Sequence, residues 1–479
     1  MTFTLSRKKR PDFVRPFFFS FLCHNQTMNF EGYPCSWIKE VLQINQENLF
    51  SFFNQIQTDS RKIKPGDLFV PLKGDSFDGH DFIQQAIKAG ATGVLTELPF
   101  SSSEVDVFEV KDTLKAYEAL GVSWRKKFNL PMISIIGSVG KTTTKEMIAS
   151  FLQAKFQFVH KTIGSQNGMI GIPMTLLEIR KHHQCSIVEI GIDSIGTMKK
   201  HIQNVSPTHL LMTTLGPEHL EFLKDIETVV SEEWSGIQEA TKQGATTIVN
   251  LSDPLQAPLI QNEQTYGFEK QATVYSQIEE GHLLIETKKQ KFKVPLLLEG
   301  LHHALNQTGA IAATLEVGLQ PEDFQKGASL FSPAEGRAQM KELNGIQFYC
   351  DYYNANPTSM LAAIKTLQSH KNRQWYVLGD MLELGPKEVV FHENLAQPII
   401  DANPYGVYLH GPLMKSLCDK LKKKGFSGEI EFFENREKLA KQLILKIKNG
   451  DLIFLKGSRG RKIREVWYFL ESHFKTLSS

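Results

Sequence analysis

A chain of 479 residues is too long for one hydrophobic core and predicts about three domains of roughly 150 residues each. Its 54 Lys and Arg nearly balance its 52 Asp and Glu, which gives no support to a nucleic-acid or membrane-surface partner. The five cysteines are scattered without CxxC spacing, so a disulfide framework or a zinc site is disfavoured, and a reducing compartment, the cytoplasm, fits best.

Residues 1–27 join a basic start to an apolar patch, a pattern that is similar to a signal peptide. Arg15 and Pro16 interrupt the patch, no small-residue cleavage site follows it, and it is too short to span a bilayer. We interpret the segment as a disordered extension or an over-long start, with Met28 opening the first ordinary segment. No other segment has the pattern of a membrane span, so no membrane insertion is expected.

The pattern of residues 28–125 predicts a small α/β domain. A Pro-Gly turn leads into an apolar run at 67–72 that predicts a strand, and a helix is expected over 81–91, where Gly90 ends it. A further strand is expected at 92–97.

Residues 126–316 alternate apolar runs with helical stretches, which predicts a parallel sheet with crossover helices. Strands are expected at 133–136, 185–192, 208–215 and 245–250. The alternating run at 282–298 predicts a hairpin or a small antiparallel patch.

Residues 317–479 predict a third α/β domain. Its strands are expected at 347–353, 373–380, 406–411, 430–433 and 451–457. The boundaries between domains follow changes in this alternation, because no low-complexity linker marks them. The expected fold class is therefore α/β, in three domains.

A glycine-rich turn follows the expected strand 133–136 and precedes a helix whose apolar residues lie three or four apart. Its glycines let backbone N–H groups curl around an anion, Lys141 reaches the outer phosphates, and the Thr142 hydroxyl suits Mg²⁺. The turn lacks the opening glycine of the longer phosphate-loop pattern, and an ordinary glycine turn is the alternative. We favour an ATP site made by Gly137, Ser138, Val139, Gly140, Lys141, Thr142 and Thr143.

Two further polar residues follow expected strands of the same sheet. Glu189 stands at the end of a strand, where a parallel sheet places its ligands. Alone it would be a solvated strand-end acid, but beside a phosphate loop the Mg²⁺-ligand interpretation is favoured. His219 follows a Gly-Pro turn after strand 208–215; a lone histidine is usually a packed or surface residue, so its role depends on the motif as a whole.

Longer motifs occur in an order that resembles one family. They are "TDSRKIKPGDLFVPLKGDSFDGHDF", "GSVGKTTTKEM", "NGMIGIPMTLLE", "VEIGID", "LGPEHLE", "GLHHALN", "EGRAQ", "DYYNANPTSMLAAI", "VLGDMLELG" and "LKGSRG". From about residue 30 to the C-terminus the chain is similar to the Mur ligases of bacterial cell-wall synthesis. The resemblance implies a central P-loop ATPase-type parallel sheet, flanked by a small N-terminal α/β domain and a Rossmann-like C-terminal α/β domain.

The resemblance also implies site residues. The N-terminal domain holds the UDP end of the substrate, in a stretch that includes Ser60 and Arg61. His219 matches the second-metal ligand of the family and joins Thr142 and Glu189 as the metal set. The other implied positions are Asn306 at the adenine, Arg337 at the phosphates, Asp351 at the ribose, and Asn167, Asn354 and Asn356 at the substrate.

Family membership implies an ATP- and Mg²⁺-dependent amide ligase, a monomer, that works through an acyl phosphate. The motifs at 353–360 and 377–385 resemble those of the member that joins D-alanyl-D-alanine to UDP-N-acetylmuramoyl-tripeptide. Three alternatives stay open. They are the member that adds the third peptide residue, although its DNPR signature is absent, a folate polyglutamylating ligase, and a nucleotide-binding homologue that has lost catalysis.

One departure from the family falls at the metal site. Mur ligases usually carry a carbamylated lysine fourteen residues after the metal histidine, and this count from His219 reaches Glu233. Either the alignment is shifted, or the second metal site is lost, or Glu233 supplies a permanent carboxylate and acts with Lys141 and His219 in catalysis. His303, Thr214 and Gly168 also stand where the family usually has asparagine.

Overall fold

The computed structural model describes residues 32–74, 77–192 and 194–478. The expected extension, residues 1–27, lies outside the described residues. The chain divides into two compact units: the described part of Met1–Lys39 with Asn45–Glu109, and Glu40–Ile44 with Val110–Ser479. Within the described ranges, no helix combines the length and apolarity needed to cross a bilayer.

The first unit is built on a short parallel sheet with the strand order β3 (Ile56–Gln57), β4 (Leu68–Phe69), β5 (Gly93–Thr96) and β6 (Asp106–Glu109). The elements around it are β1 (Tyr33–Pro34), β2 (Phe52–Phe53), α1 (Cys35–Leu42) and α2 (Ile83–Lys88). Strand β4 is shorter than the expected run 67–72, which contains Pro71, a residue without an N–H for the sheet ladder.

The second unit contains a nine-stranded sheet with the order β15-β14-β13-β12-β11-β10-β7-β9-β8. Its strands are β7 (Met132–Ile136), β8 (Val159–Lys161), β9 (Cys185–Glu189), β10 (His209–Met212), β11 (Thr246–Asn250), β12 (Gln264–Gly267), β13 (Val274–Glu279), β14 (His282–Thr287) and β15 (Lys291–Pro295). Pairing is parallel from β8 to β13, which confirms the expected parallel sheet. Strands β13, β14 and β15 pair antiparallel, so the expected antiparallel patch is also confirmed.

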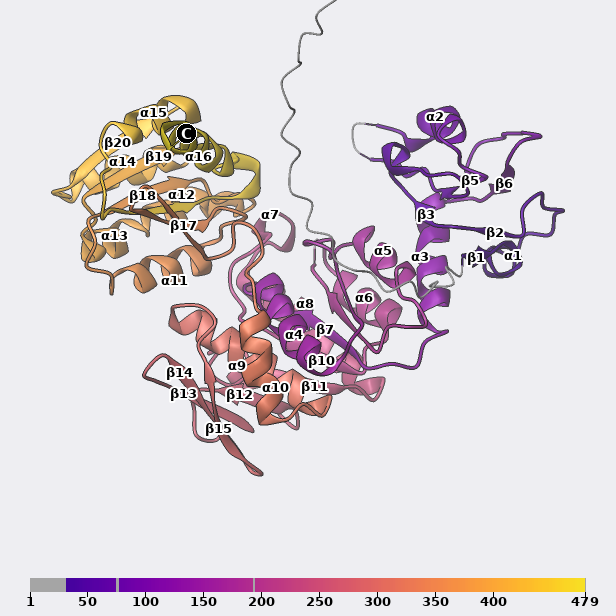
Figure 1. Cartoon of the computed structure of the whole chain (residues 1–479), viewed down its shortest axis with the longest axis horizontal. Helices are drawn as coiled ribbons and strands as arrows, with labels where there is room; N and C mark the ends of the chain where they lie inside the picture. The colour runs from indigo at the N-terminus through magenta and orange to yellow at the C-terminus, as the bar shows by residue number, and fades with distance from the viewer. Residues whose placement is uncertain (1–31, 75–76, 193, 479) are drawn as a thin grey trace, which may run out of the picture. The chain divides into compact units, whose positions relative to one another are not determined.

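The helices of this part of the unit lie on the faces of the sheet or pack against helices that do so. They are α3 (Thr113–Arg125), α4 (Lys141–Lys155), α5 (Gly171–Leu177), α6 (Thr197–Val205), α7 (Leu220–Leu223), α8 (Ile226–Lys242), α9 (Leu301–Glu316) and α10 (Pro321–Leu330). Helices α4, α9 and α10 lie together (Figure 1) and bury residues such as Phe151, Ile311 and Phe324 in one core. Helices α5, α6 and α8 contribute to a separate core that contains Ile202 and Ile237.

A six-stranded sheet with the order β16-β17-β21-β18-β19-β20 completes the second unit. Its strands are β16 (Gln339–Leu343), β17 (Ile346–Asp351), β18 (Gln374–Gly379), β19 (Gly406–His410), β20 (Glu429–Phe433) and β21 (Leu452–Lys456). The surrounding helices are α11 (Pro357–Leu367), α12 (Glu388–Glu393), α13 (Ala396–Ala402), α14 (Met414–Lys423), α15 (Arg436–Ile444) and α16 (Arg464–Ser478). All its pairings except β16–β17 are parallel.

Parallel pairing decides where the polar loops fall, because the carboxyl ends of parallel strands meet at one edge of a sheet. In the nine-stranded sheet, β7, β9 and β10 lie side by side and end next to the glycine turn, Glu189 and the 213–219 loop. In the six-stranded sheet, β17, β21 and β18 are neighbours and lead into the loops at 352–356, 457–458 and 380–384.

Candidate active site

The loop between β7 and α4 is a tight cradle that only glycine permits at two positions. Gly137 has φ +112° and Gly140 has φ +95°, the left-handed region. A Cβ atom at Gly137 would lie 2.5 Å from Thr213 Oγ1, and one at Gly140 would lie 2.5 Å from Asn306 Oδ1. Helix α4 begins at Lys141, so its N-terminal N–H groups and partial positive charge face the space beside the loop.

Lys141 lies inside a group of carboxylates. Its Nζ donates to the Gly137 carbonyl and lies 3.5 Å from Glu218 Oε2. Burial opposes the charged form of Lys141, but the field of Glu218 and two further glutamates outweighs it and raises the pKa of the ammonium. The side chain therefore stays cationic, as a group that contacts phosphate must.

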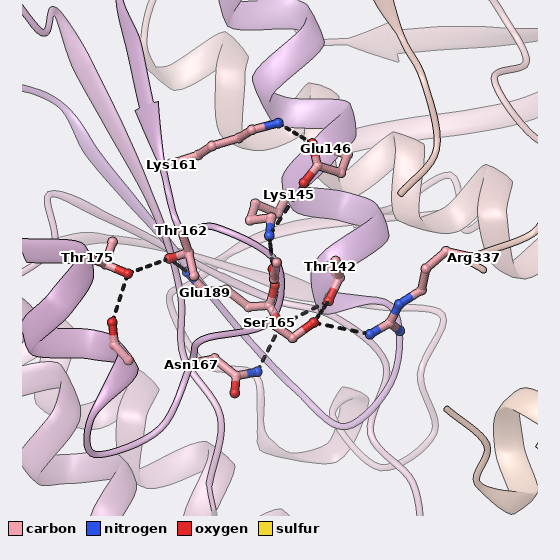
Figure 2. A network of polar contacts seen from close by, with 12 residues as sticks. Thr142, Lys145, Glu146, Lys161, Thr162, Ser165, Asn167, Thr175, Glu189 and Arg337 are labelled. Atoms are coloured by element: carbon pink, nitrogen blue, oxygen red, sulfur yellow. Dashed lines mark hydrogen bonds and ion pairs between the residues drawn. The ribbon is translucent and has the colours of Figure 1, made fainter. Parts of the chain in front are cut away.

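Thr142 and Glu189 meet at the base of the loop. Thr142 Oγ1 donates to Glu189 Oε1 at 3.0 Å, and Asn167 Nδ2 donates to the same oxygen at 2.8 Å. The other oxygen, Glu189 Oε2, is buried and has no hydrogen-bond donor in the described part of the chain. Figure 2 shows these side chains converging from α4, β9 and the 164–168 loop.

A second lysine, which the motif analysis missed, lies behind this carboxylate. Lys145 is fully buried, and its Nζ lies 3.3 Å from Glu189 Oε2 and 3.4 Å from Glu146 Oε1. It also donates to the Gly164 carbonyl. The signal in the sequence was its spacing, since Lys145 stands one helical turn after Lys141. Figure 2 shows the Glu146 carboxylate bridging Lys145 to Lys161.

His219 is held by a residue from the six-stranded part of the unit. Its backbone is left-handed, with φ +49°, and its Nδ1 lies 2.6 Å from Glu383 Oε2. Burial alone would lower the pKa of the imidazole, but the hydrogen bond to Glu383 and the nearby Glu218 carboxylate raise it. Glu383 belongs to the 380–384 loop, and sequence reasoning did not assign it to this histidine.

Glu233 lies on α8, fully buried beneath the glycine loop. Its Oε2 accepts a hydrogen bond from the Gly137 N–H at 2.9 Å, and its Oε1 has no hydrogen-bond partner within the described residues. Burial raises the pKa of this carboxyl to about 8, although nearby Lys141 works in the opposite direction. The structure therefore brings Glu233 to the loop from behind.

The front of the loop opens into a cavity of about 330 Å³. Its walls carry Lys141, Thr142, Glu189 and His219, with Asn167 beside them. The opposite wall comes from the six-stranded sheet and comprises Arg337, Tyr353, Asn354, Ala355, Asn356, Leu382, Glu383, Leu384, Ser458, Arg459 and Gly460. The structure thus gathers most of the predicted site residues around one space.

A smaller cavity of about 80 Å³ adjoins the loop on the side of Asn306 and Asp351. Val139, Thr143, His302 and His303 are among its other lining residues. Asp351 Oδ2 lies 2.5 Å from Lys456 Nζ, and its Oδ1 accepts from the Ala338 N–H at 3.2 Å. The residues implied for the adenine and ribose therefore share one side of the loop.

Two guanidinium groups contact the ring of Tyr353. The Arg337 guanidinium lies 4.2 Å from the ring centroid and that of Arg459 lies 5.7 Å from it. Arg337 Nη2 also approaches Ser165 Oγ at 3.4 Å, and Ser165 lies 3.1 Å from Thr142 Oγ1 (Figure 2). Arg337 is thereby placed at the phosphate end of the cavity.

The loops after β18 and β21 are bonded to each other. The Ser458 N–H donates to the Asp380 carbonyl, the Leu382 N–H donates to Ser458 Oγ, and Ser458 Oγ donates to the Ala355 carbonyl, each at 3.0 Å. Asp380 Oδ2, fully buried, pairs with Arg461 Nε at 2.8 Å. This wall of the cavity is therefore preorganised.

Three predicted substrate residues have local roles in the structure. Asn356 caps α11, since its Oδ1 accepts from the Ser359 N–H at 2.9 Å. Ser60 and Arg61 belong to the first unit, in the short helix Ser60–Lys62, and Arg61 forms an exposed pair with Asp59.

The donors at the loop fit Mg²⁺ and a nucleotide phosphate. No group of three or more His, Cys, Asp or Glu side chains lies in metal-binding arrangement among the described residues. The fit rests on oxygens. Glu189 Oε2 is buried and faces Lys145 at 3.3 Å but accepts no hydrogen bond among the described residues, and with the nearby Thr142 hydroxyl it suits a hard cation. The cradle between Gly137 and Gly140 suits a phosphate for the reasons given above.

A parallel sheet with a phosphate loop at its carboxyl edge, faced by an arginine-bearing second sheet, defines a P-loop type of α/β enzyme. Three family models match the chain: "Mur ligase family, catalytic domain" over residues 53–122, "Mur ligase middle domain" over 135–314, and "Mur ligase, glutamate ligase domain" over 336–459. A relative from Bacillus subtilis, named UDP-N-acetylmuramoyl-tripeptide–D-alanyl-D-alanine ligase, is 33% identical over 86% of this chain and 92% of its own length. The chain belongs to the Mur ligase family.

Further relatives agree with this assignment. A Synechocystis protein of the same name is 33% identical over 85% of this chain and 89% of its own. The crystal structure of MurF from Acinetobacter baumannii superposes with a TM-score of 0.82 at 27% identity, covering 92% of this chain and 99% of that one. The Thermotoga maritima MurF structure, in complex with ADP, has a TM-score of 0.76 at 26% identity and covers 88% and 98%. The expected three-domain α/β fold is confirmed.

Proposed function

We infer that this chain is a peptidoglycan-precursor ligase that adds D-alanyl-D-alanine to UDP-N-acetylmuramoyl-tripeptide. The similarity to relatives named for that reaction, over 86% of the chain at 33% identity, carries this inference. The structure supports it because the phosphate loop, Glu189, His219 and Arg337 face one cavity.

ATP and Mg²⁺ are part of the proposal. Lys141 and the glycine loop would hold the phosphates, with Asn306 and Asp351 toward the nucleoside. Thr142 and Glu189 would hold Mg²⁺, with His219 on the same wall. When bound, the ion would neutralise charge on the transferring phosphoryl group. A relative that crystallised with ADP supports the nucleotide assignment.

The chemistry that this cavity would support has two steps. A carboxylate oxygen of the tripeptide attacks the terminal phosphorus of ATP, the bond to the β-phosphate oxygen breaks, and ADP leaves. The amine of the dipeptide, having lost its extra proton, then attacks the acyl carbon, and phosphate leaves as the amide forms. The residues of this chain contribute positioning and charge, because phosphoryl transfer needs little covalent participation by the protein.

We also propose which substrate each domain binds. Residues 28–125 would bind the UDP end through Ser60 and Arg61, residues 126–316 would bind ATP, and residues 317–479 would cover the nucleotide and receive the dipeptide. Support for the assignment of the second and third domains comes from the two walls of the 330 Å³ cavity, which are supplied by the nine-stranded and the six-stranded sheets.

We further propose that the protein is a cytoplasmic monomer. Sedimentation analysis of the pure protein would test the oligomeric state.

Glu233 is proposed to take the place of the family's carbamylated lysine. Its position beneath Gly137 and its Oε1, which lacks a donor among the described residues, support the role. Burial favours the protonated acid, with a pKa of about 8, so a bound cation would be needed to hold the group as a carboxylate. Glu233→Ala is expected to lower turnover about 100-fold, and Glu233→Lys to regain part of it with added bicarbonate. Glu232→Ala, the matched neighbour, is expected to change little. Full activity of Glu233→Ala would contradict the role.

Phosphate release from ATP tests the function as a whole. Purified protein is incubated with UDP-N-acetylmuramoyl-tripeptide and either D-alanyl-D-alanine or single amino acids. We expect stimulation by the dipeptide alone, and a loss of at least about 100-fold in Lys141→Met. Lys155→Met, at the far end of the same helix, serves as the control. Stimulation by a single amino acid, or none by the dipeptide, would overturn the proposal.

A further inference from the structure

Arg459 is a cation of the cavity wall that pairs with no carboxylate among the described residues. It begins the short helix Arg459–Arg461, directly after the loop that follows β21. The residue is exposed, and its guanidinium lies 5.7 Å from the centroid of the Tyr353 ring. Its near neighbour Arg461 differs, because it is paired with the buried Asp380 at 2.8 Å.

The phosphate end of the cavity already has two cations, Lys141 and Arg337, and Arg337 is linked to Thr142 through Ser165. Arg459 lies on the same wall as Arg337, beside Leu382, but no hydrogen bond or ion pair among the described residues ties its side chain to the phosphate end. An uncommitted cation beside an apolar side chain, on a preorganised wall, describes a subsite for a small, partly apolar anion.

The proposed reaction supplies such an anion. D-alanyl-D-alanine carries two methyl groups, an amine that must reach the acyl carbon at the phosphate end, and a carboxylate that stays free. An extended dipeptide separates amine from carboxylate by about 7 Å. A dipeptide with its amine at the phosphates would therefore direct its carboxylate away from them.

We propose that Arg459 binds the free carboxylate of the incoming dipeptide, with Leu382 against its methyl groups. The guanidinium offers two parallel N–H donors, the geometry that a carboxylate accepts best. The ring of Tyr353 limits the conformations of the side chain before the ligand arrives. The inference rests on the proposed function, since it names the recognition element for its second substrate.

The test changes the protein and the ligand together. KM for D-alanyl-D-alanine is compared with KM for D-alanyl-D-alaninamide, which lacks the carboxylate, in the wild-type chain, Arg459→Ala and Arg459→Lys. In the wild type, KM for the dipeptide is expected to be about 10- to 100-fold lower than KM for the amide. Arg459→Ala is expected to have similar KM values for the two ligands, and Arg459→Lys is expected to show a smaller difference than the wild type. Turnover at saturating dipeptide is expected to change far less than KM.

Arg436→Ala is the matched control, because it removes an arginine at the start of helix α15 that is paired with Glu465. A preference for the carboxylate that survives in Arg459→Ala would overturn the inference. So would a variant that raises KM for ATP or for the UDP-tripeptide instead, since Arg459 would then hold another anion. Failure of the wild type to use either dipeptide would reject the proposed function itself, so the two failures are distinct.

Discussion

Single buried charges organise this site, and Lys145 is the clearest of them. It lies behind Glu189, at 3.3 Å, in a position that solvent does not reach. A buried carboxylate is stable in its charged form only with partners, and Lys145 is the cation that faces the proposed metal ligand from the protein side. It acts as a positioning residue for Glu189.

Lys145→Met is expected to raise the Mg²⁺ concentration needed for half-maximal phosphate release by about 10- to 100-fold, because residues that orient a metal ligand usually have effects of that size. The measurement is a Mg²⁺ titration at saturating ATP, together with the Mg²⁺-dependent rise in thermal midpoint. Lys161→Met removes a half-exposed lysine that pairs with Glu146, and should leave the titration unchanged. An unshifted titration in Lys145→Met would contradict the role.

His303 links stability to pH. Both ring nitrogens lack hydrogen bonds within the described residues, and burial, aided by His302 and Lys456, holds the pKa of the ring well below 6.5. The unfolded chain binds a proton at this position near pH 6.5 and the folded chain resists it, so stability falls as pH drops below 6.5. His303→Asn is expected to show a smaller fall in thermal midpoint between pH 7 and pH 5. An equal fall would refute this.

The residues of the site that could be predicted from the sequence are those whose role follows from a short, continuous stretch of the chain. Lys141 and Thr142 follow from one turn, and Glu189 from the end of one strand. Glu383 and Arg459 were missed because their meaning depends on which distant loops face the phosphate turn. The order of the strands in the sheets brings those loops together, and that order cannot be read from the spacing of residues in the sequence.

At the level of elements, the turn before α4 combines two separate demands on glycine. Gly140 needs both a left-handed backbone and space beside Asn306, whereas Gly244 has φ +85° and nothing within 4 Å of an added Cβ. Alanine at Gly244 is expected to cost about 1 kcal/mol of stability through its left-handed backbone, and alanine at Gly140 is expected to cost more, because its Cβ would also clash with Asn306. Only Gly140→Ala should weaken nucleotide binding, measured by titration calorimetry. Equal binding by both variants would contradict the cradle.

Element types were also easier to predict than their extents. Alternation of apolar and helical runs predicted the parallel sheets, and the polar–apolar pattern at 282–298 predicted the antiparallel strands. The run at 67–72 formed a strand of two residues, Leu68–Phe69, and the helix expected over 81–91 became a tight turn followed by Ile83–Lys88. Local apolarity does not specify where a partner strand ends.

For the whole molecule, the two compact units predict separate responses to ligands. Every residue that lines the two loop cavities belongs to Val110–Ser479. Mg²⁺ and ATP at about 100 times the dissociation constant should stabilise that unit by about 2.7 kcal/mol. Scanning calorimetry should then show one transition moving upward while the transition of Asn45–Glu109 stays in place. A parallel shift of both would contradict independent units.

The bonds that join the loop after β18 to the loop after β21 have an evolutionary consequence. Ser458 meets Asp380 only through backbone atoms, and its hydroxyl bonds Leu382 and Ala355, so its side chain is not tied to that of Asp380. The Arg461 side chain pairs with the buried Asp380 carboxylate, so loss of either one leaves the other charge without its partner. In an alignment of relatives, positions 380 and 461 should therefore co-vary, and lineages with a neutral residue at 380 should also lack the arginine at 461.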